Sequence, residues 1–381
     1  MARARSTKSA ETANAPVLVL QGGGALGAYQ AGAFEAMAAD ARQPGWVAGI
    51  SIGAINAALI AGNAPEHRVE RLKAFWERVT AAVPGSPWSS PNDLVRSWIN
   101  DWSAAWSASF GLPGFFRPRL GTGTLFGAAE NPSIYDTGPL RDTLLELVDF
   151  DRLNDGPTRL SVGAVDVQSG NFAYFDNRHG RIRPEHVMAS GALPPGFPAI
   201  SIDGRMYWDG GIVSNTPLRH VVENLSTAEA TIFQVDLFSA RGELPGTLAQ
   251  VAEREKDIRF SSRTRAVTDV LRERHEMHRR IRTLASMLPA SRRTDSSVQE
   301  LLADTNDTAI TLVHLIHRNK GYETQTKDYE FSRASMLEHW SAGHSDMNHS
   351  LHALSSAPRA THPNDFRVFD FNPNPTRGIR S

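Results

Sequence analysis

Near its amino terminus the chain reads VLVLQGGGALGAYQAGAFEAM, residues 17–37, an apolar run joined to a helical pattern by three consecutive glycines. An apolar run of this length, followed by glycines and then by helical periodicity, is typical of a strand, a tight turn and a helix. Such a unit favours a parallel sheet covered by helices, because the helix has to return the chain across the sheet. Backbone amides of a glycine turn at a helix start also bind negative charge, so this stretch constrains function as well as fold.

Short apolar runs alternate with helical periodicity as far as about Ala240. This alternation predicts an α/β fold with a mainly parallel central sheet and helices on both faces. Within it, the dipeptide Asp203-Gly204 suits the tight turn of a hairpin whose second strand ends at Asp209. Besides the two short strands of that hairpin, the strands that we expect are residues 17–20, 46–50, 159–167, 172–175 and 231–238.

Changes in composition divide the chain into segments. The polar residues 1–15 predict a flexible tail, and residues 16–240 predict one α/β domain. An insertion rich in proline, glycine and aromatic residues interrupts this domain at about 86–120. The charged residues 241–355 predict a mostly helical C-terminal extension, and residues 356–381, rich in proline and asparagine, predict an irregular tail.

Opposite charges nearly balance, with 40 lysines and arginines against 41 aspartates and glutamates, so no overall field favours a nucleic-acid partner. The chain has no cysteine, which excludes disulfides, thiolate nucleophiles and cysteine metal sites. Its first residues lack the apolar run of a secretory signal. Its most apolar segment, residues 47–64, is interrupted by polar residues and falls short of about 20 spanning residues. We therefore expect a cytoplasmic protein, either free or in peripheral contact with a membrane.

The glycine turn also matches the dinucleotide fingerprint, with Gly22, Gly24 and Gly27 at the required spacing. A dinucleotide site further needs an acidic residue at the end of the second strand, where it binds the ribose hydroxyls. Here the second strand, WVAGI, is followed by Ser51, and the nearest carboxylate, Asp40, precedes that strand. We therefore expect no dinucleotide and no other cofactor.

The pentapeptide GISIG at residues 49–53 has the pattern G-x-S-x-G of a nucleophile elbow, placed between a strand and an apolar helix. Small residues on both sides let the chain turn sharply, so that the serine hydroxyl projects from the sheet edge. Small residues also occur where a helix packs tightly on a sheet, so the motif alone is weak. The two motifs explain each other, because acyl transfer creates an oxyanion that the glycine turn can surround with amides. The predicted oxyanion hole faces Ser51 and consists of the amides of Gly22, Gly23, Gly24 and Ile52.

Four sequence blocks together carry a resemblance. They are GGGALG at residues 22–27, GISIG at residues 49–53, DGG at residues 209–211 and, as a softer match, ASGALPPGFPAI at residues 189–200. With these blocks in this order and spacing, the sequence resembles the patatin-like phospholipase family across about residues 16–240. The resemblance implies the patatin-like α/β fold and a serine acyl hydrolase with a Ser-Asp dyad.

Carried over to this chain, the resemblance implies Ser51 as nucleophile, Asp209 as its base and the glycine turn as oxyanion donor. One position departs from the family pattern, because the family often has an arginine where this chain has Leu26. No headgroup or fold role of that arginine can be transferred, whereas an oxyanion hole of backbone amides does not depend on it. Asp209 also fits a turn aspartate that binds its own backbone before two glycines. An aspartate with a pKa near 4 is a weak base at neutral pH, so the dyad requires burial that raises this pKa.

The activity implied is hydrolysis of lipid carboxylic esters, as by a phospholipase A or lipid acyl hydrolase, through an acyl-enzyme. Two alternatives are an esterase acting on short-chain esters or an intracellular polyester, and a non-catalytic lipid-binding scaffold. The segment after residue 244 is similar to an extension found in a bacterial subset of the family. It could cover the active site or support dimerisation, and the sequence does not choose between them. Headgroup preference, acyl-chain preference and oligomeric state do not follow from the sequence.

Histidines offer other ways to activate a serine or bind a metal. His179, His186 and His220 lie in or near the α/β domain, but none carries a recognisable motif, and each fits an ordinary surface or core residue. The sequence HEMH at residues 275–278 spaces two histidines by three positions, whereas a zincin helix spaces them by four. No third ligand is evident, so we expect no metal.

Two further sequence patterns each fit either contact with a membrane or a purely structural explanation. Trp98, Trp102 and Trp106 repeat every four residues, which places them on one helix face. Together with Phe110, Phe115 and Phe116 they could line an acyl channel or form an interfacial lid, whereas a packed amphipathic helix explains the same spacing. Residues 253–293 hold twelve lysines and arginines against six acidic residues, which suits anionic headgroups or a solvated helix face.

Overall fold

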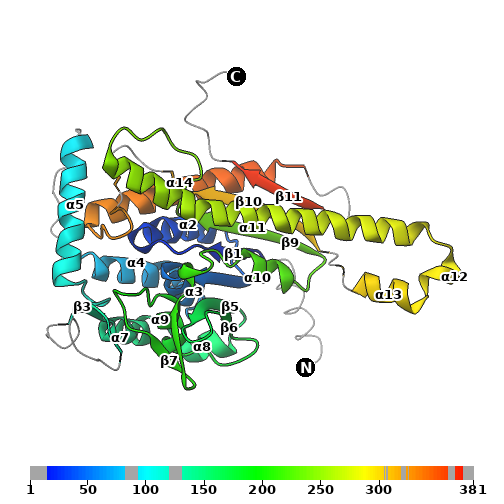
Figure 1. Cartoon of the computed structure of the whole chain (residues 1–381), viewed down its shortest axis with the longest axis horizontal. Coiled ribbons are helices and arrows are strands. Elements are labelled where there is room, and N and C mark those ends of the chain that lie inside the picture. Colours follow the sequence, from blue (N-terminus) through cyan, green and yellow to red (C-terminus); the bar gives the residue numbers. More distant parts are fainter. Residues whose placement is uncertain are drawn as a thin grey trace.

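The computed structural model describes residues 15–81, 93–119, 131–303, 305, 308–318, 323–324, 326–358 and 365–371. The side chains of residues 93–99, 262 and 263 are outside this description. The tail predicted for residues 1–15 lies, except for residue 15, outside the described residues. Parts of the insertion predicted at about 86–120 and of the tail predicted at 356–381 also lie outside them. Figure 1 shows the arrangement of the helices and strands.

In the described part of the chain, the central sheet has nine strands, and a separate two-stranded sheet pairs β3 (Arg117–Pro118) with β4 (Tyr135–Asp136). The strands of the central sheet are β1 (Val17–Leu20), β2 (Trp46–Ile50), β5 (Arg159–Asp166), β6 (Phe172–Asp176), β7 (Ile200–Ile202), β8 (Arg205–Asp209), β9 (Glu229–Asp236), β10 (Ala309–Ile316) and β11 (Phe366–Asp370).

The strand order of the central sheet is β11-β10-β9-β1-β2-β5-β8-β7, and β6 also pairs with β5. The six strands from β11 to β5 run parallel to one another, while β6, β7 and β8 pair antiparallel at one end. The turn of the β7–β8 hairpin has positive φ at Asp203 and Gly204, the conformation that this dipeptide favours. The predicted mainly parallel α/β fold is therefore confirmed.

Two short 3₁₀ helices and twelve α-helices connect these strands in the described residues. They are η1 (Gly24–Leu26), α2 (Gly27–Ala39), α3 (Ile52–Ala61), α4 (Arg68–Val79), α5 (Asp93–Phe110), α7 (Gly138–Leu147), α8 (Phe150–Asp155), α9 (Pro184–Ser190), η2 (Gly210–Ile212), α10 (Leu218–Glu223), α11 (Leu248–Met287), α12 (Ala290–Arg293), α13 (Ser296–Ala303) and α14 (Arg333–Ser355). No helix among the described residues is both long enough and apolar enough to pass through a bilayer.

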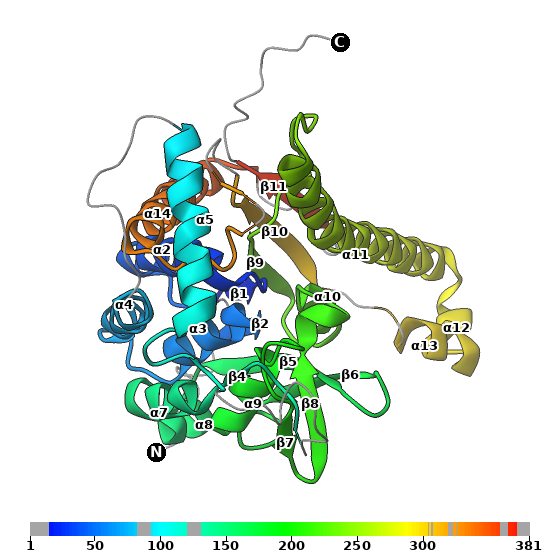
Figure 2. The same cartoon turned by 60° about the vertical axis from the view of Figure 1, so that its left-hand side comes forward.

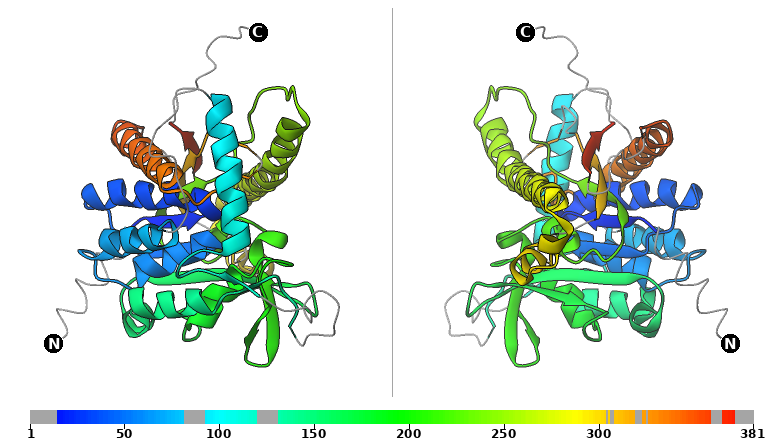
Figure 3. Two further views of the ribbon diagram at one scale, coloured as in Figure 1. Left: turned by 90° about the vertical axis from the view of Figure 1, so that its left-hand side faces the viewer. Right: turned by 90° about the vertical axis from the view of Figure 1, so that its right-hand side faces the viewer.

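Both faces of the sheet are covered, because successive strand residues point to opposite sides. In β1, Leu18 and Leu20 pack in a core with α2, α3, α4 and α14, whereas Val17 and Val19 pack in a second core with α10 and α11. Figure 3 shows the blue and orange helices on one side of the sheet and the long yellow-green helix on the other. The central strands are therefore buried on both faces.

The C-terminal part differs from the predicted extension in one respect, although it is mostly helical. Its strands β10 and β11 join the central sheet beside β9, so the sheet does not end near residue 240. The prediction of an irregular tail from residue 356 is wrong where β11 forms. An apolar run as short as AITLVHLI cannot be assigned to a strand or a helix from its periodicity alone, and this explains why β10 was missed.

The helix α11 extends beyond the sheet and leads to α12 and α13 (Figure 1). Figure 2 shows this arm projecting from the body of the molecule. Unlike α11, which extends away from the body of the molecule, α14 packs closely on α2. A Cβ atom on Gly343 would lie 1.9 Å from the carbonyl oxygen of Tyr29, so the two backbones meet at a position that admits only glycine. The C-terminal part is thus built into the same core as the N-terminal strands.

Candidate active site

Ser51 occupies the sharp turn between β2 and α3. Its backbone has φ 55° and ψ −124°, a conformation that residues with a Cβ atom rarely adopt and that costs on the order of 1–3 kcal/mol. A Cβ atom on Gly49 would lie 2.2 Å from the carbonyl oxygen of Gly53, and one on Gly53 would lie 2.5 Å from the carbonyl oxygen of Leu20. The two glycines of the motif are therefore required by the close approach of β1, β2 and α3.

Ser190, which the sequence analysis did not select, holds this turn from α9. Its hydroxyl donates a hydrogen bond to the carbonyl of Gly163 at 2.6 Å and accepts one from the amide of Ser51 at 3.0 Å. The Ser51 amide is consequently already paired. Ser190 lies in the block ASGALPPGFPAI, but nothing in that block indicates its contact with β5, which arises only when α9 packs on the sheet.

Asp209 ends β8 and meets Ser51. The amide of Gly211 donates a hydrogen bond to Oδ1 of Asp209 at 2.7 Å, and the hydroxyl of Ser51 lies close enough to the carboxylate to lower its pKa. The predicted partners thus converge from β2 and β8, although β5 lies between these strands in the sheet. Gly211 also accounts for the second glycine of DGG, because a Cβ atom there would lie 2.9 Å from Oδ1 of Asn215.

Burial is the main influence on the acidity of Asp209. The residue is 2% exposed, and burial raises the pKa of its carboxyl group to about 7, although the hydrogen bonds from Ser51 and Gly211 act in the opposite direction. A carboxylate with a pKa near neutrality is a much better proton acceptor than an ordinary aspartate. The burial that the sequence analysis required is therefore present.

The glycine turn lies beside Ser51, but its amides are not equivalent. The amide of Gly22 donates to the carbonyl of Asn215 at 3.1 Å, so the prediction that Gly22 donates to an oxyanion disagrees with its hydrogen bonding. No group in the described part of the chain accepts a hydrogen bond from the amides of Gly23 or Gly24. Ile52 begins α3, where an amide cannot be paired within the helix. Gly23, Gly24 and Ile52 therefore retain donors for a developing negative charge.

Asn215 clamps the turn from the other side and was missed by the sequence analysis. Besides accepting from the Gly22 amide through its carbonyl, it donates from Nδ2 to the carbonyl of Gly22 at 2.8 Å. A Cβ atom on Gly22 would lie 2.4 Å from Oδ1 of Asn215 and 3.1 Å from Cβ of Ser51. Its position in the polar sequence SNT, a few residues after DGG, is the only signal that could have suggested it.

A segment from the C-terminal part completes the surroundings of the turn. The carbonyl of Asp328 accepts a hydrogen bond from the amide of Ala25 at 2.9 Å, and its carboxylate pairs with Lys256 of α11. The next residue, Tyr329, is half exposed. Burial raises the pKa of Tyr329 to about 12, and the charges of Asp328 and Asp209 act in the same direction. No motif indicates this segment, because it is distant in the sequence.

The three histidines considered from the sequence have other surroundings. His220 stacks on Tyr174 with ring centroids 3.9 Å apart and lies 3.7 Å from a carboxylate oxygen of Asp176. His186 accepts a hydrogen bond from the amide of Arg183 at 2.9 Å, and His179 has an exposed ring near Asp176. The structure therefore brings none of them to Ser51 through these contacts.

The aromatic stripe on α5 faces solvent. Trp102 is 45% exposed and Phe110 is 63% exposed, and the partly buried ring of Trp106 lies between theirs in tilted contact with both. The buried positions of this helix are small, among them Ser103 and Ser107. Trp102 is therefore not packed in the core, whereas Trp106 is partly buried and still fits a packed amphipathic helix. The side chain of Trp98 lies outside the described residues.

Phe115 and Phe116 behave differently from the stripe. Both are buried and make ring contacts with Phe197, and Phe115 also contacts Phe331 at a centroid distance of 6.1 Å. They belong to the main core. A role for these two rings in an interfacial lid is thus not supported.

The remaining features of the sequence analysis lie on α11. His275 packs on Phe366, and together with His278 it lines a cavity of about 610 Å³ between α10 and α11. Several arginines of residues 253–293 pair with acids of the same helix, as Arg279 does with Glu276. Neither this cavity nor one of about 660 Å³ beside α8 and α9 is lined by Ser51 or Asp209.

Comparisons with known proteins agree with the four sequence blocks. The family model of patatin-like phospholipases matches residues 18–222, and a second model, described as patatin phospholipase, matches residues 258–362. No curated protein matches the chain.

Two solved structures are similar to the chain at low scores. VipD from Legionella pneumophila has a TM-score of 0.40 and 14% identity, over 89% of this chain and 67% of that one. The type III effector protein ExoU has a TM-score of 0.30 and 14% identity, over 90% of this chain and 53% of that one, so this chain spans about half its length. Because the model of patatin-like phospholipases covers more than half of the sequence, the protein belongs to the patatin-like phospholipase family.

Proposed function

We propose that this chain is a lipid acyl hydrolase that cleaves carboxylic esters with Ser51 as nucleophile and Asp209 as general base. The observation that carries the proposal is the convergence of Ser51, in the strained turn before α3, with the buried carboxylate of Asp209, which lies close enough to the Ser51 hydroxyl for that hydroxyl to lower its pKa. A nucleophile held on its base beside unpaired backbone amides is the arrangement that acyl transfer requires.

In the first half of the reaction, Oγ of Ser51 attacks the ester carbonyl while Asp209 accepts the hydroxyl proton. The carbonyl oxygen becomes an oxyanion, which the amides of Gly23, Gly24 and Ile52 stabilise. The tetrahedral intermediate then breaks its bond to the alcohol, and Asp209 returns the proton to that leaving group. The product is an acyl ester of Ser51.

In the second half, a water molecule attacks the acyl-enzyme and Asp209 accepts its proton. The same amides stabilise the second oxyanion. Breaking the bond to Oγ releases the carboxylic acid, and Asp209 returns its proton to Ser51. With its pKa near 7, Asp209 can both accept and return a proton at neutral pH.

Apolar groups near the dyad support an acyl chain as part of the substrate. Leu193 is partly exposed beside Ala192, whose carbonyl accepts a hydrogen bond from the amide of Asp209. Ile212 and Val213 are exposed in the turn that follows Asp209. Exposed apolar side chains at the edge of a catalytic turn favour a substrate with a hydrocarbon part.

The aromatic stripe supports contact with a lipid surface. Trp102, Trp106 and Phe110 contact one another in a row along α5, and Trp102 and Phe110 are exposed to solvent, an unusual place for large aromatic side chains. Tryptophan is favoured at membrane interfaces because its ring is apolar and its N–H is polar. We infer that α5 rests on the lipid while the dyad acts on an ester at that surface.

The test combines covalent labelling with product analysis. A fluorophosphonate probe should label the wild type and the control Ser201→Ala, whose serine is exposed on β7, but should not label Ser51→Ala. Defined phospholipids and neutral lipids should yield free fatty acid only with the first two proteins. Labelling that persists in Ser51→Ala would overturn the assignment of the nucleophile. Turnover confined to short p-nitrophenyl esters would instead indicate an esterase, and absence of labelling in all three proteins would indicate a scaffold.

A further inference from the structure

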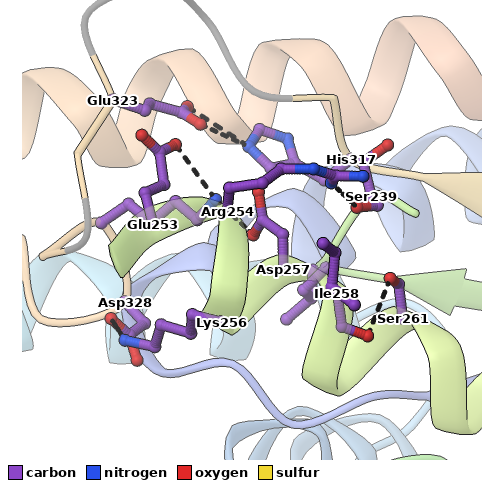
Figure 4. Close-up of polar contacts among 12 residues, drawn as sticks. Ser239, Glu253, Arg254, Lys256, Asp257, Ile258, Ser261, His317, Glu323 and Asp328 are labelled. Atoms are coloured by element: carbon purple, nitrogen blue, oxygen red, sulfur yellow. Dashed lines mark hydrogen bonds and ion pairs between the residues drawn. The ribbon is translucent and has the colours of Figure 1, made fainter. Parts of the chain in front are cut away.

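Two histidines and one glutamate converge in the C-terminal part, away from the dyad. His317 follows β10, Glu323 lies in the next described segment, and His339 projects from α14. All three are at most 7% exposed, and their ligand atoms lie within 4.8 Å of one another. Figure 4 shows the carboxylate of Glu323 directed at the ring of His317.

The distances within this cluster fit a shared ion as well as direct hydrogen bonds. Nε2 of His317 lies 3.2 Å from both oxygens of Glu323, and Nε2 of His339 lies 3.1 Å from Oε1. A charge-assisted hydrogen bond would bring one oxygen to about 2.7–2.9 Å. Neighbouring ligands around a tetrahedral zinc ion, each about 2.0–2.1 Å from the metal, are roughly 3.3 Å apart. The observed spacings lie between these two values.

The charges around the cluster also leave room for a cation. The ammonium of Lys327 lies 2.6 Å from Asp257 and 3.4 Å from Glu253, both on α11, so its charge is shared with these two carboxylates. The ion-pair partners of Glu323 among the described residues are the imidazoles of His317 and His339, while Lys327 pairs with the two acids of α11. An ionised carboxylate buried without a full counterion is costly, and a bound cation removes that cost.

A water-sized cavity provides the independent observation. It measures about 10 Å³ and is lined by polar side chains that include Glu323, Glu330 and His339. Glu330 is 3% exposed, and within the described residues its Oε2 has no hydrogen-bond partner, and neither does Nδ1 of His339. A cavity of this size holds one water molecule. Water there would accept from Nδ1–H of His339 and donate to Glu330, completing the outer contacts of a metal-binding histidine.

We propose that His317, Glu323 and His339 bind a divalent transition-metal ion, for which Zn²⁺ is the favoured candidate, with water in the fourth position. Two imidazoles and one carboxylate are a common ligand set for zinc, whereas Ca²⁺ and Mg²⁺ prefer oxygen ligands. The expectation of no metal rested on HEMH, which contributes none of these ligands.

The bound ion would tie together β10, α14 and the segment that leads to Asp328. The carbonyl of Asp328 accepts the hydrogen bond of Ala25 at the edge of the glycine turn. The metal would therefore hold the oxyanion donors in place from outside the active site. This positioning role, unlike the binding of metal, rests on the proposed function.

The experiment measures metal binding by the full-length protein independently of catalysis. Protein purified without chelator is analysed for metals by mass spectrometry, and chelator-treated protein is then titrated with Zn²⁺ or Ca²⁺ by calorimetry. One Zn²⁺ per chain is expected, with a melting temperature raised by several degrees, and Ca²⁺ should produce neither effect. Ser51→Ala should bind zinc as the wild type does, so failure of the proposed function would leave this result unchanged.

Variants separate a metal site from a hydrogen-bonded cluster. Glu323→Gln keeps the size of the side chain and can still accept from the imidazoles, but it lacks the charge. Its zinc affinity should fall by more than roughly 100-fold, beyond the usual effect of losing an outer contact. His349→Gln, which removes an exposed histidine from the same helix, should bind zinc normally.

Equal zinc affinity in the wild type and in folded Glu323→Gln would overturn the proposal, as would a wild type that binds no zinc stoichiometrically. If circular dichroism shows that Glu323→Gln does not fold, His339→Gln provides the second variant. The melting temperature of the wild type with and without zinc tests the proposal without any variant. A shift that Ca²⁺ reproduces would also contradict it.

Discussion

Asp209 and Glu323 are both buried carboxylates, but their surroundings differ in charge. Asp209 has only neutral hydrogen-bond donors, from Ser51 and Gly211, and burial raises its pKa to about 7. Burial also acts to raise the pKa of Glu323, but His317 and His339 outweigh it and hold that pKa well below its usual value. The first carboxylate is poised to exchange a proton, whereas the second keeps its charge.

The difference shows that burial alone does not determine what a carboxylate does. Without a cationic partner, burial favours the neutral acid and gives a base that works near neutral pH. With two imidazoles on one carboxylate, the charged form is favoured and the group suits a permanent partner such as a metal ion. The dyad and the cluster can therefore be separated by substitutions that remove charge and little else.

The largest expected effect distinguishes these two carboxylates by activity. Asp209→Asn should lower kcat/KM for a soluble ester by about 10⁴-fold, as expected when a serine loses its proton acceptor. Glu323→Gln should lower it by less than about tenfold, because that residue would act only through the position of the glycine turn. Initial rates with a p-nitrophenyl ester measure both. Comparable losses in the two variants would refute the assignment of Asp209 as the base.

The next effect tests the contact between the C-terminal segment and the glycine turn. Gly24 has φ +55°, and a Cβ atom there would lie 2.1 Å from the carbonyl oxygen of Asp328. Gly24→Ala should therefore displace the oxyanion donors and lower kcat by about 10²-fold to 10³-fold. Gly170→Ala is the matched control, because Gly170 has a similar φ of +69° with nothing within 4 Å of the added atom. Equal activities of these two variants would show that the contact with Asp328 is unimportant.

The pH dependence of the rate should follow the pKa of Asp209. Below pH 7 the carboxyl group is protonated and cannot accept the Ser51 proton, so kcat/KM should fall by about tenfold for each pH unit. Above pH 7 the carboxyl group of Asp209 is ionised, so kcat/KM should no longer depend on its protonation. Rates with a soluble, non-ionisable ester give this profile. A profile that turns near pH 4 would mean that burial does not raise this pKa.

The contribution of Asp209 to the free energy of unfolding should fall as the pH rises, whereas kcat/KM should rise. Because the folded-state pKa of Asp209 is raised, the folded protein binds this proton more tightly than the unfolded chain does. The stability that the protonated carboxyl group of Asp209 contributes to the fold is present below about pH 4 and is lost as the pH rises to about 7. Asp209→Asn carries no such charge and should be more stable than the wild type at pH 8, by at most about 4 kcal/mol. Denaturant melts at pH 5 and pH 8 should show a larger difference at pH 8.

The smallest effect concerns the surface of α5. Replacing Trp102 and Trp106 by alanine should weaken binding to phospholipid vesicles several-fold, because the exposed ring of Trp102 and the partly exposed ring of Trp106 are lost from α5. Hydrolysis of a soluble ester and the melting temperature should change little. Leu337→Ala, which removes an equally exposed apolar side chain from α14, is the control. A similar loss of vesicle binding in the control would indicate that the stripe has no special role.

Much of the fold was predictable because its signals are local. The strand, glycine turn and helix at residues 17–39, the elbow around Ser51 and the hairpin ending at Asp209 are all set by residues that are neighbours in the sequence. The two C-terminal strands were missed because β10 has a continuous apolar run and β11 is short, and neither has a periodicity of its own. Their place in the sheet depends on β9, which lies far away in the sequence.

The candidate site divides in the same way. The sequence indicated Ser51, Asp209 and the glycine turn through motifs, but it could not show which amides were already paired. The amide of Gly22 is paired because it donates a hydrogen bond to the carbonyl of Asn215. The amide of Ala25 is paired because it donates one to the carbonyl of Asp328. No local pattern connects His317, Glu323 and His339 either, since three separate segments bring them together.

Local sequence alone set most of the N-terminal elements, the turn at Ser51 and the residues proposed to react, because glycines, apolar runs and short motifs act on their nearest neighbours. Long-range packing set the acidity of Asp209, the pairing of the backbone amides and the exposure of Trp102 and Phe110 on α5. These properties depend on burial and on the partners of each polar group. Both are set by which distant segments pack against each other.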